Sequence, residues 1–310
     1  MKRMLKYAVP VFCALILTGT AYSLGQRECR ARKKFEQGQK HYTNWKARGT
    51  KMSKITAICN QKGGVGKTLT AISLGVGLAR MDKKVLLVDV DAQGSLTASL
   101  GYQHPDQIET TLATLLELLI MDKPVFPGAG IIHHAEGVDL LPANIELSGL
   151  EVTLVNTMSR ETILREYLNS VRDQYDVILL DCCPSLGMLT INALAAADDV
   201  LVPMQAHYLS LKGFEQLIRT ISNVKRKINP KLDIAGILIT MADMRTNYSR
   251  DIVELLRSAY GESVRIFDSI IPLSIRAAET SAEGKSIYLH DPAGKVSAAY
   301  AAFTQEVVAL

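Results

Sequence analysis

The 310-residue sequence contains no Cys-x-x-Cys pair and no spaced set of Cys and His residues. This absence excludes the common structural zinc sites, and five cysteines are too few for a disulfide-stapled scaffold. There is also no internal repeat and no low-complexity linker, which argues against a solenoid and against a string of separate domains. With 48% hydrophobic and 21% charged residues, the chain is neither disordered nor collagen-like.

The cysteines nearest to the glycine-rich and acidic motifs are Cys59, Cys182 and Cys183, and they lie in apolar stretches typical of strands. We expect them to be buried and to act as small hydrophobic residues. A reducing compartment is the simplest inference from such cysteine usage.

Positive charge is concentrated in the first 51 residues. They hold 12 Lys and Arg against 2 Asp and Glu, a net charge of +10, whereas the remaining residues hold 23 basic and 29 acidic side chains, a net charge of −6. The overall charge of +4 is therefore no indication that the folded part binds nucleic acid. Any basic surface there has to be local.

This leader, residues 1–51, contains an uncharged and mostly apolar stretch at 7–24. The stretch is long enough for a membrane anchor and also resembles a signal peptide. The basic segment that follows it disfavours export, because positively charged flanks resist translocation. Met52 directly precedes the first expected core strand, so we favour a translation start there over a membrane anchor.

From residue 54 onward, short apolar runs alternate with helical stretches. This alternation predicts an α/β fold over residues 52–310, with a mainly parallel twisted sheet and helices on both faces. Strands are expected at 54–60, 85–89, 138–141, 177–181, 200–203, 234–240 and 265–271. The expected helices include 68–80, 186–197, 210–228, 249–260 and 294–308.

A glycine-rich segment joins the first expected strand to the first expected helix. It reads Asn60-Gln61-Lys62-Gly63-Gly64-Val65-Gly66-Lys67-Thr68. The ordinary phosphate loop, GxxxxGK[ST], requires glycine at position 61, where this chain has Gln61. The remainder is chemically complete, because backbone N–H groups and the helix N-terminus can face phosphate, Lys67 can reach the β and γ phosphates, and the Thr68 hydroxyl can bind Mg²⁺.

The lysine at the head of KGGVGKT resembles the deviant Walker A motif of the ParA/MinD family of ATPases. Five further blocks, in order, are similar to the ParA/Soj partitioning proteins. They are VLLVDVDAQGSLT (85–97), YDVILLDCCPSLG (175–187), VLVPMQAHYLSLKG (200–213), MADMRTNYS (241–249) and SIIPLSIRAAETSAEGKSI (269–287). The resemblance implies a P-loop NTPase fold, hydrolysis of ATP to ADP and phosphate with Mg²⁺, and a homodimer that forms when ATP binds.

The resemblance also implies roles for individual residues. The expected nucleotide contacts are Lys62, Gly63, Gly64, Val65, Gly66, Lys67, Thr68, Leu69 and Pro272. The expected catalytic residues are Lys62, Lys67 and Asp91, and the expected magnesium site consists of Thr68, Asp91 and Asp181. In the family, the residue matching Lys62 reaches across the dimer to the partner's nucleotide.

Two aspartates lie at the end of the second expected strand. Asp91 occupies a loop position from which it can reach the γ-phosphate, so we favour it as the residue that orients the attacking water. For Asp89 we favour the interpretation of a buried structural carboxylate. Departures from the family pattern include Leu69 for Thr and His207 for Glu, and neither removes a charge from the catalytic set.

Non-specific DNA binding through the C-terminal half is a further implication of the resemblance. Residues 212–276 hold 11 Lys and Arg against 7 Asp and Glu, a local excess of basic charge. The candidate DNA contacts are Lys225, Arg226, Lys227, Arg245, Arg250 and Arg276. The three at 225–227 also have a structural explanation, because basic side chains complement the dipole of a helix C-terminus.

The expected function is an ATP-dependent dimerising switch for chromosome or plasmid partitioning, in the cytoplasm on the nucleoid, with a ParB-like centromere-binding partner that stimulates hydrolysis. The alternatives are a MinD-like or other cargo-positioning ATPase and a membrane-anchored bacterial tyrosine kinase. A MinD-like protein would end in a basic amphipathic helix, yet residues 298–310 contain no Lys or Arg. A kinase of that type would carry a tyrosine-rich tail, and the last 30 residues contain only Tyr288 and Tyr300.

Overall fold

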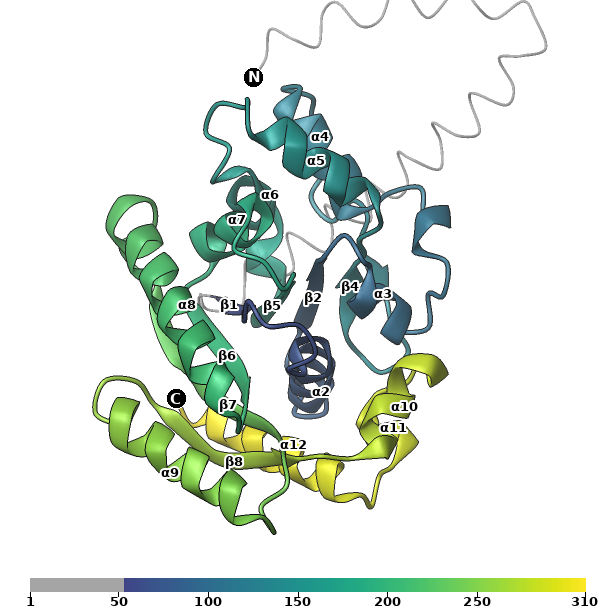
Figure 1. Ribbon diagram of the computed structural model, residues 1–310. Helices are drawn as coiled ribbons and strands as arrows, with labels where there is room; N and C mark the ends of the chain where they lie inside the picture. The colour runs from purple at the N-terminus through teal and green to yellow at the C-terminus, as the bar shows by residue number, and fades with distance from the viewer. Residues whose placement is uncertain (1–52) are drawn as a thin grey trace, which may run out of the picture. The chain divides into compact units, whose positions relative to one another are not determined.

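The computed structural model describes residues 53–310, in which the expected strands pair into one sheet. The expectations for residues 7–24 and for the rest of the leader fall on residues outside this range. The order of the strands is β3-β4-β2-β5-β1-β6-β7-β8 (Figure 1). The strands are β1 (Lys54–Ile58), β2 (Val85–Val90), β3 (Ile132–His133), β4 (Asp139–Leu141), β5 (Val177–Cys182), β6 (Asp199–Gln205), β7 (Asp233–Ala242) and β8 (Ile266–Pro272). Only the β3–β4 pair in this described sheet is antiparallel.

Helices cover both faces of the sheet (Figure 1). One face packs against α2 (Lys67–Ala79), α3 (Ser95–Ser99), α11 (Ile287–His290) and α12 (Lys295–Val308). The other packs against α4 (Leu112–Ile120), α5 (Glu146–Leu154), α6 (Ile163–Val171), α7 (Met188–Ala196), α8 (Tyr208–Lys227) and α9 (Asn247–Tyr260). The remaining helix is α10 (Ile275–Glu283), and short 3-10 turns occupy Pro105–Gln107 and Arg172–Gln174.

Burial on both faces explains why the strands are continuous apolar runs. In β2, Leu86 and Val88 enter one hydrophobic cluster, and Leu87 between them enters the other. A strand whose side chains are buried on both faces of the sheet has no polar face. The prediction of a mainly parallel sheet with helices on both faces is confirmed.

The seven expected strands and the five expected helices all form, with ends shifted by a few residues. The exception in the sheet is β3, an edge strand of two residues that the sequence pattern did not indicate. A segment this short shows no period, so pattern reasoning has nothing to detect.

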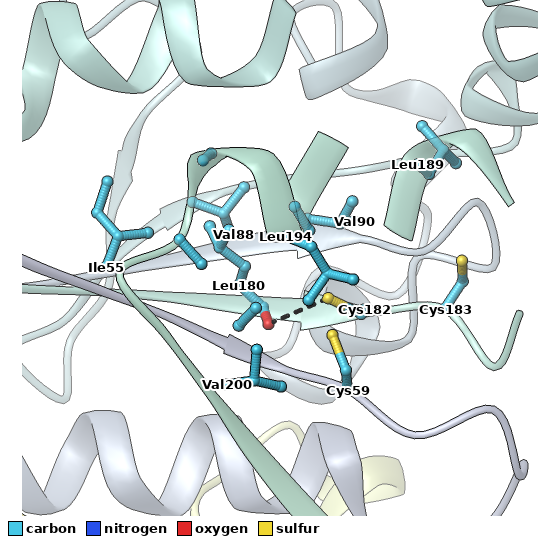
Figure 2. Packing of buried hydrophobic residues seen from close by; sticks show 14 of the residues in the cluster. Ile55, Cys59, Val88, Val90, Leu180, Cys182, Cys183, Leu189, Leu194 and Val200 are labelled. Carbon is cyan, nitrogen blue, oxygen red and sulfur yellow. Dashed lines mark hydrogen bonds between the residues drawn. The ribbon is translucent and has the colours of Figure 1, made fainter. Parts of the chain in front are cut away.

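The three cysteines in these strands and the loop that follows are buried and free. Figure 2 shows Cys59 and Cys182 among aliphatic side chains, including Leu180 and Val200, and the Cys182 thiol donates to the carbonyl oxygen of Leu180 at 3.7 Å. The neighbouring Cys59 thiol and burial raise the pKa of Cys182, which keeps its thiol protonated and unreactive. The expectation of buried, small hydrophobic residues is confirmed.

Seven parallel strands of the described sheet end at one edge, called here the carboxyl edge, and the loops that follow six of them carry the functional motifs. The chain passes from β1 to β2 on one side of β1 and later from β5 to β6 across it. Ligands of open α/β sheets bind at such a change in direction, outside the carboxyl ends of the strands. Among residues 53–310, no helix is both long and apolar enough to cross a membrane.

Candidate functional site

The loop between β1 and α2 adopts a backbone shape that needs glycine. Gly64 has a φ of +69° and Gly66 a φ of +83°, values that side chains with a Cβ rarely adopt. A Cβ on Gly64 would meet no atom within 4 Å, and Gly63 and Gly64 are exposed. The outer side of the loop is therefore open, next to the N-terminus of α2, where unpaired N–H groups and the helix dipole favour an anion.

The inner side of the loop is held by β6 and β7. The Thr240 hydroxyl of β7 donates to the carbonyl oxygen of buried Val65 at 2.8 Å. Asn60 donates to the carbonyl oxygen of Pro203 in β6 at 2.8 Å and accepts from the backbone N–H of Lys62 at 3.0 Å. These contacts hold the loop against β6 and β7.

Two ammonium groups belong to this loop. Lys67 is buried, with 8% of its surface exposed, and its Nζ donates to the carbonyl oxygen of Lys62 at 3.3 Å. The Nζ of Lys62 donates to the side-chain oxygen of Gln205, the last residue of β6, at 3.3 Å. Two cations at a helix N-terminus, with little acidic compensation in the loop, make a site for a highly charged anion.

Asp89 and Asp181 lie side by side, as register partners on β2 and β5. Asp89 is fully buried and accepts from the Thr97 hydroxyl at 2.7 Å, from the Thr97 N–H at 2.9 Å and from the Asp91 N–H at 3.2 Å. Burial raises its pKa to about 6 against these hydrogen bonds. Both oxygens of Asp89 accept hydrogen bonds from α3 or the end of β2, which agrees with the interpretation of Asp89 as a structural carboxylate.

Asp181 is also buried, but neither of its carboxylate oxygens has a hydrogen-bond partner in the described structure. Burial, followed by the charge of Asp89, raises its pKa to about 8. The Thr68 hydroxyl lies close enough to lower this pKa, though without normal hydrogen-bond geometry, and the Lys67 charge acts in the same direction. An unpartnered buried carboxylate beside a hydroxyl fits a hydrated divalent cation.

No three His, Cys, Asp or Glu side chains among residues 53–310 form a ready-made metal cluster. Mg²⁺ keeps several waters and is usually bound through one or two carboxylates and the phosphates of its nucleotide. Thr68 and Asp181 fit such a site. Asp91 is half-buried just after β2, where its side chain accepts from the Gln93 N–H at 3.0 Å.

Pro272 ends β8 on the carboxyl edge and is half-buried. Since β8 is the third strand from β1, normal strand spacing places Pro272 about 14 Å from β1 along that edge. Leu69 lies in the first turn of α2, where its backbone N–H adds to the N-terminal donors.

The candidate DNA contacts fall into two groups. Lys225, Arg226 and Lys227 form the last turn of α8, and Lys225 lies 3.4 Å from Asp233 at the start of β7, which places this group at the amino edge of the sheet. Arg245, Arg250 and Arg276 follow β7 and β8 at the carboxyl edge. The six candidate DNA contacts therefore lie at two opposite edges of the sheet, one strand length apart.

The carboxyl-edge arginines are exposed, and each has a local polar contact. The Arg245 guanidinium donates twice to Asp243, each time at 2.8 Å, and holds the pKa of that carboxyl at about 2. Arg250 donates to the side chain of Asn247 at 2.8 Å, and Arg276 lies 3.7 Å from Glu279.

Sequence reasoning assigned no role to Gln205, Thr240 or Met241, although all three contact the phosphate loop. Gln205 and Met241 stand in blocks that carry the family resemblance, and their position there was the available signal. Thr240 had none. Met241 adopts a left-handed φ of +52°, and its methyl carbon lies 3.6 Å from the position that a Cβ on Gly66 would take.

Fold and site together define a P-loop NTPase of the deviant Walker A type. The AAA_31 family model, an AAA domain, matches residues 53–234. The sporulation initiation inhibitor protein Soj of Bacillus subtilis is 41% identical over 260 residues, covering 83% of this chain and 99% of that protein. The chromosome partitioning protein ParA of Myxococcus xanthus is 41% identical over 259 residues, 83% of this chain and 88% of that one. The chain belongs to the ParA/Soj family, and the resemblance seen in the sequence is confirmed.

Solved structures agree with this assignment. Cobyrinic acid a,c-diamide synthase from Mycobacterium smegmatis, with bound ADP and magnesium, matches with a TM-score of 0.72 and 37% identity, over 83% of this chain and 94% of that chain. The cell division ATPase MinD of Pyrococcus furiosus matches with a TM-score of 0.64 at 21% identity, over 83% of this chain and 99% of that chain. The latter likeness concerns the fold alone.

Proposed function

We propose that this protein is a partitioning ATPase that binds Mg²⁺ and ATP, dimerises in the ATP-bound state and hydrolyses ATP. The observation that carries the proposal is the arrangement at the carboxyl edge, where Lys62 and Lys67 share one preformed phosphate loop with the unpartnered carboxylate of Asp181 beside it. This combination of charges suits a nucleoside triphosphate with its metal.

Within this proposal, the N–H groups of residues 63–69 bind the phosphate oxygens, and Lys67 neutralises the β and γ phosphates. Thr68 and Asp181 would hold Mg²⁺. Bound Mg²⁺ would stabilise the negative charge that develops on the phosphate oxygens of the leaving group. Asp91 orients the attacking water from its loop position, and Pro272 borders the adenine.

Lys62 has a different role from Lys67. Its Nζ donates to the side chain of Gln205, whereas the Nζ of buried Lys67 donates to the carbonyl oxygen of Lys62. In this proposal Lys62 contacts a nucleotide bound by a second copy of the chain, where it stabilises the transferred charge as an arginine finger does. ATP then becomes part of a homodimer interface.

The names of the relatives suggest the biological setting. We infer a role in chromosome or plasmid partitioning, with the ATP-bound dimer on non-specific DNA of the nucleoid in the cytoplasm, and a ParB-like centromere-binding partner that stimulates hydrolysis. The carboxyl-edge residues Arg245, Arg250 and Arg276 are the proposed DNA contacts. The last helix, α12, buries Val296, Tyr300 and Phe303 against the sheet, which argues against its use as a membrane-binding helix of the MinD kind.

The test is light scattering of the full-length chain with and without a non-hydrolysable ATP analogue. Lys62→Ala and Lys62→Gln should bind the analogue and remain monomeric at concentrations where the unaltered chain dimerises. Lys295→Ala, which removes an exposed lysine at the start of α12, serves as the control and should dimerise normally. An ATP-dependent dimer of either Lys62 variant would overturn the cross-subunit role.

A further inference from the structure

Gln205 lies at the junction of three parts of the site. Its amide oxygen accepts from the Lys62 ammonium at 3.3 Å, and its amide nitrogen donates to the carbonyl oxygen of Gly64 at 3.1 Å. The same nitrogen lies 3.2 Å from the sulfur of Met241 at the end of β7. One side chain thus contacts the head of the phosphate loop, its central glycine and the neighbouring strand.

The orientation of this amide is determined by its partners. A carbonyl oxygen can only accept a hydrogen bond and an ammonium can only donate one, so the oxygen of Gln205 has to face Lys62 and its nitrogen has to face Gly64. Rotation of the amide by half a turn would break both bonds. In this conformation the side chain of Gln205 therefore presents a hydrogen-bond acceptor to residue 62.

Met241 contacts Gln205, and its backbone adopts an unfavourable conformation there. Its φ of +52° lies in the left-handed region, which is uncommon for a residue other than Gly, Asn or Asp. This conformation brings its sulfur to Gln205 and its methyl group toward Gly66. Strain retained at such a position is typical of functional sites.

We propose that Gln205 is a positioning residue that holds Lys62 on its own subunit in the absence of nucleotide, and that release of this hydrogen bond makes Lys62 available to a second copy of the chain. The inference rests on the proposed cross-subunit role of Lys62. It adds a resting state, in which Lys62 is hydrogen-bonded to Gln205 of its own subunit. A hydrogen bond between an ammonium and a neutral amide is weaker than one between an ammonium and a phosphate anion, so Lys62 can move to the phosphate.

Two substitutions of similar size change this contact in opposite directions. Gln205→Glu keeps an acceptor and adds a negative charge, so it holds the Lys62 ammonium more strongly. Gln205→Met removes the acceptor while filling the same space, so Lys62 is released. A purely structural role would make both variants weaken the loop in the same way, because both lose the donor to Gly64.

The first measurement concerns Lys62 alone and does not depend on dimerisation. The full-length chain without nucleotide is treated briefly with an amine-acetylating ester near neutral pH, and the modified fraction of Lys62 is measured by mass spectrometry relative to exposed Lys295. Gln205→Met should raise the reactivity of Lys62 about fivefold, the effect of losing one ordinary hydrogen bond. Gln205→Glu should lower it. Equal reactivity in both variants, or a change in the same direction, would overturn the proposal.

The second measurement is the protein concentration at which half of the chain dimerises with a non-hydrolysable ATP analogue. Gln205→Met should lower this concentration, and Gln205→Glu should raise it, again by about fivefold. The same two changes at exposed Gln305 of α12 are the matched controls and should leave it unchanged. Loss of dimerisation in both Gln205 variants would indicate a structural role and overturn the proposal.

The two measurements separate the inference from the function on which it rests. If the unaltered chain forms no ATP-dependent dimer, the proposed function fails, whatever the reactivity of Lys62. If the dimer forms but Lys62 reacts equally in all Gln205 variants, the proposed function stands and the holding role of Gln205 fails.

Discussion

Asp89 and Asp181 show how their neighbours give the same residue type two roles. Both are buried register partners on adjacent strands. Thr97 satisfies Asp89 through its N–H and its hydroxyl, which ties the carboxylate to α3. Asp181 has no such partner and remains available to a cation. The two aspartates therefore differ in their hydrogen-bond partners and not in their burial.

The raised pKa of Asp181 predicts a specific dependence of stability on pH. The folded protein keeps this proton up to a pH of about 8, whereas the unfolded chain loses it near 3.8. Between these values the folded state binds more protons, so the free energy of unfolding falls as the pH rises. Asp181→Asn removes this titrating carboxyl. The difference in free energy of unfolding, variant minus unaltered protein, should therefore grow by a few kcal/mol in favour of the variant between about pH 5 and about pH 8.

The measurement is urea unfolding of the chain free of nucleotide and magnesium at several pH values. Comparing the variant with the unaltered protein at each pH cancels the contributions of groups that do not interact with Asp181, so the difference reports the titration of Asp181 together with its neighbour Asp89. Parallel stability curves would show that Asp181 is already ionised in the folded state.

Lys67 and Asp91 should separate binding from hydrolysis. Lys67→Ala removes a buried ammonium from the phosphate loop and should abolish measurable ATP binding together with hydrolysis. Asp91→Ala should bind ATP normally, because it removes no phosphate donor, and lose about 10² to 10⁴ in turnover, the range for loss of a group that acts on the attacking water. Binding of a fluorescent ATP analogue and release of phosphate measure the two effects. Wild-type turnover in Asp91→Ala would remove Asp91 from the mechanism.

At the residue scale, the sequence predicted what lies in local motifs. Lys67 and Thr68 follow directly from a strand, loop and helix pattern, and Asp181 from a buried strand end. Gln205 contacts Lys62 from 143 residues away, and Thr240 contacts Val65 from 175 residues away. Such pairs depend on which strands become neighbours, and a local pattern contains no record of that.

At the scale of elements, the close approach of α2 to β2 depends on glycine in the middle of a helix. A Cβ on Gly75 would lie 2.6 Å from a methyl carbon of Leu87, a fully buried residue of β2. Alanine there would gain about 1 kcal/mol of helix propensity and lose about 1–3 kcal/mol through overpacking. We therefore expect Gly75→Ala to destabilise the protein.

Gly149 in α5 provides the matched control. It is exposed, and a Cβ there would meet no atom within 4 Å. Gly149→Ala should therefore gain helix propensity and stabilise the protein by up to about 1 kcal/mol. Urea unfolding of both variants tests the pair, and a Gly75→Ala protein as stable as the Gly149→Ala protein would contradict the packing argument.

The helices and strands of this protein were not equally predictable from the sequence. The apolar run at 177–181 predicted β5 almost to the residue, because a strand buried on both faces has a sharp polar boundary at each end. The sequence between β2 and β5 was harder. There β3 has only two residues, neither of them buried, and shows no period. The helices α4, α5 and α6 in the same stretch were assigned no ranges.

At the scale of the whole molecule, charge has to be considered by location. Residues 52–310 carry a net charge of −6, so a single copy should bind DNA weakly through one local basic group. Arg245 and Arg276 follow neighbouring strands at the same edge as the phosphate loop. A dimer formed across that edge would place two such groups on one duplex.

Dimerisation should therefore switch on DNA binding. Joining two weak contacts raises affinity through effective concentration by about 10² to 10⁴ without any new contact. ATP should produce this gain, with steep salt dependence and little sequence preference. The assay uses a chain that begins at Met52, because the leader, with its charge of +10, could bind DNA by itself and imitate the result.

Matched charge reversals decide which edge of the sheet meets the DNA. Arg245→Glu combined with Arg276→Glu changes the carboxyl edge, and Lys225→Glu combined with Lys227→Glu makes the same change in charge at the amino edge. We expect the first pair to weaken ATP-dependent binding and to reduce its salt dependence by about one unit per lost phosphate contact, with ATP-dependent dimerisation intact. The second pair should have the smaller effect, because the strands separate it from the phosphate loop. Equal DNA affinity of the unaltered protein with ATP, with ADP and without nucleotide would refute the switch.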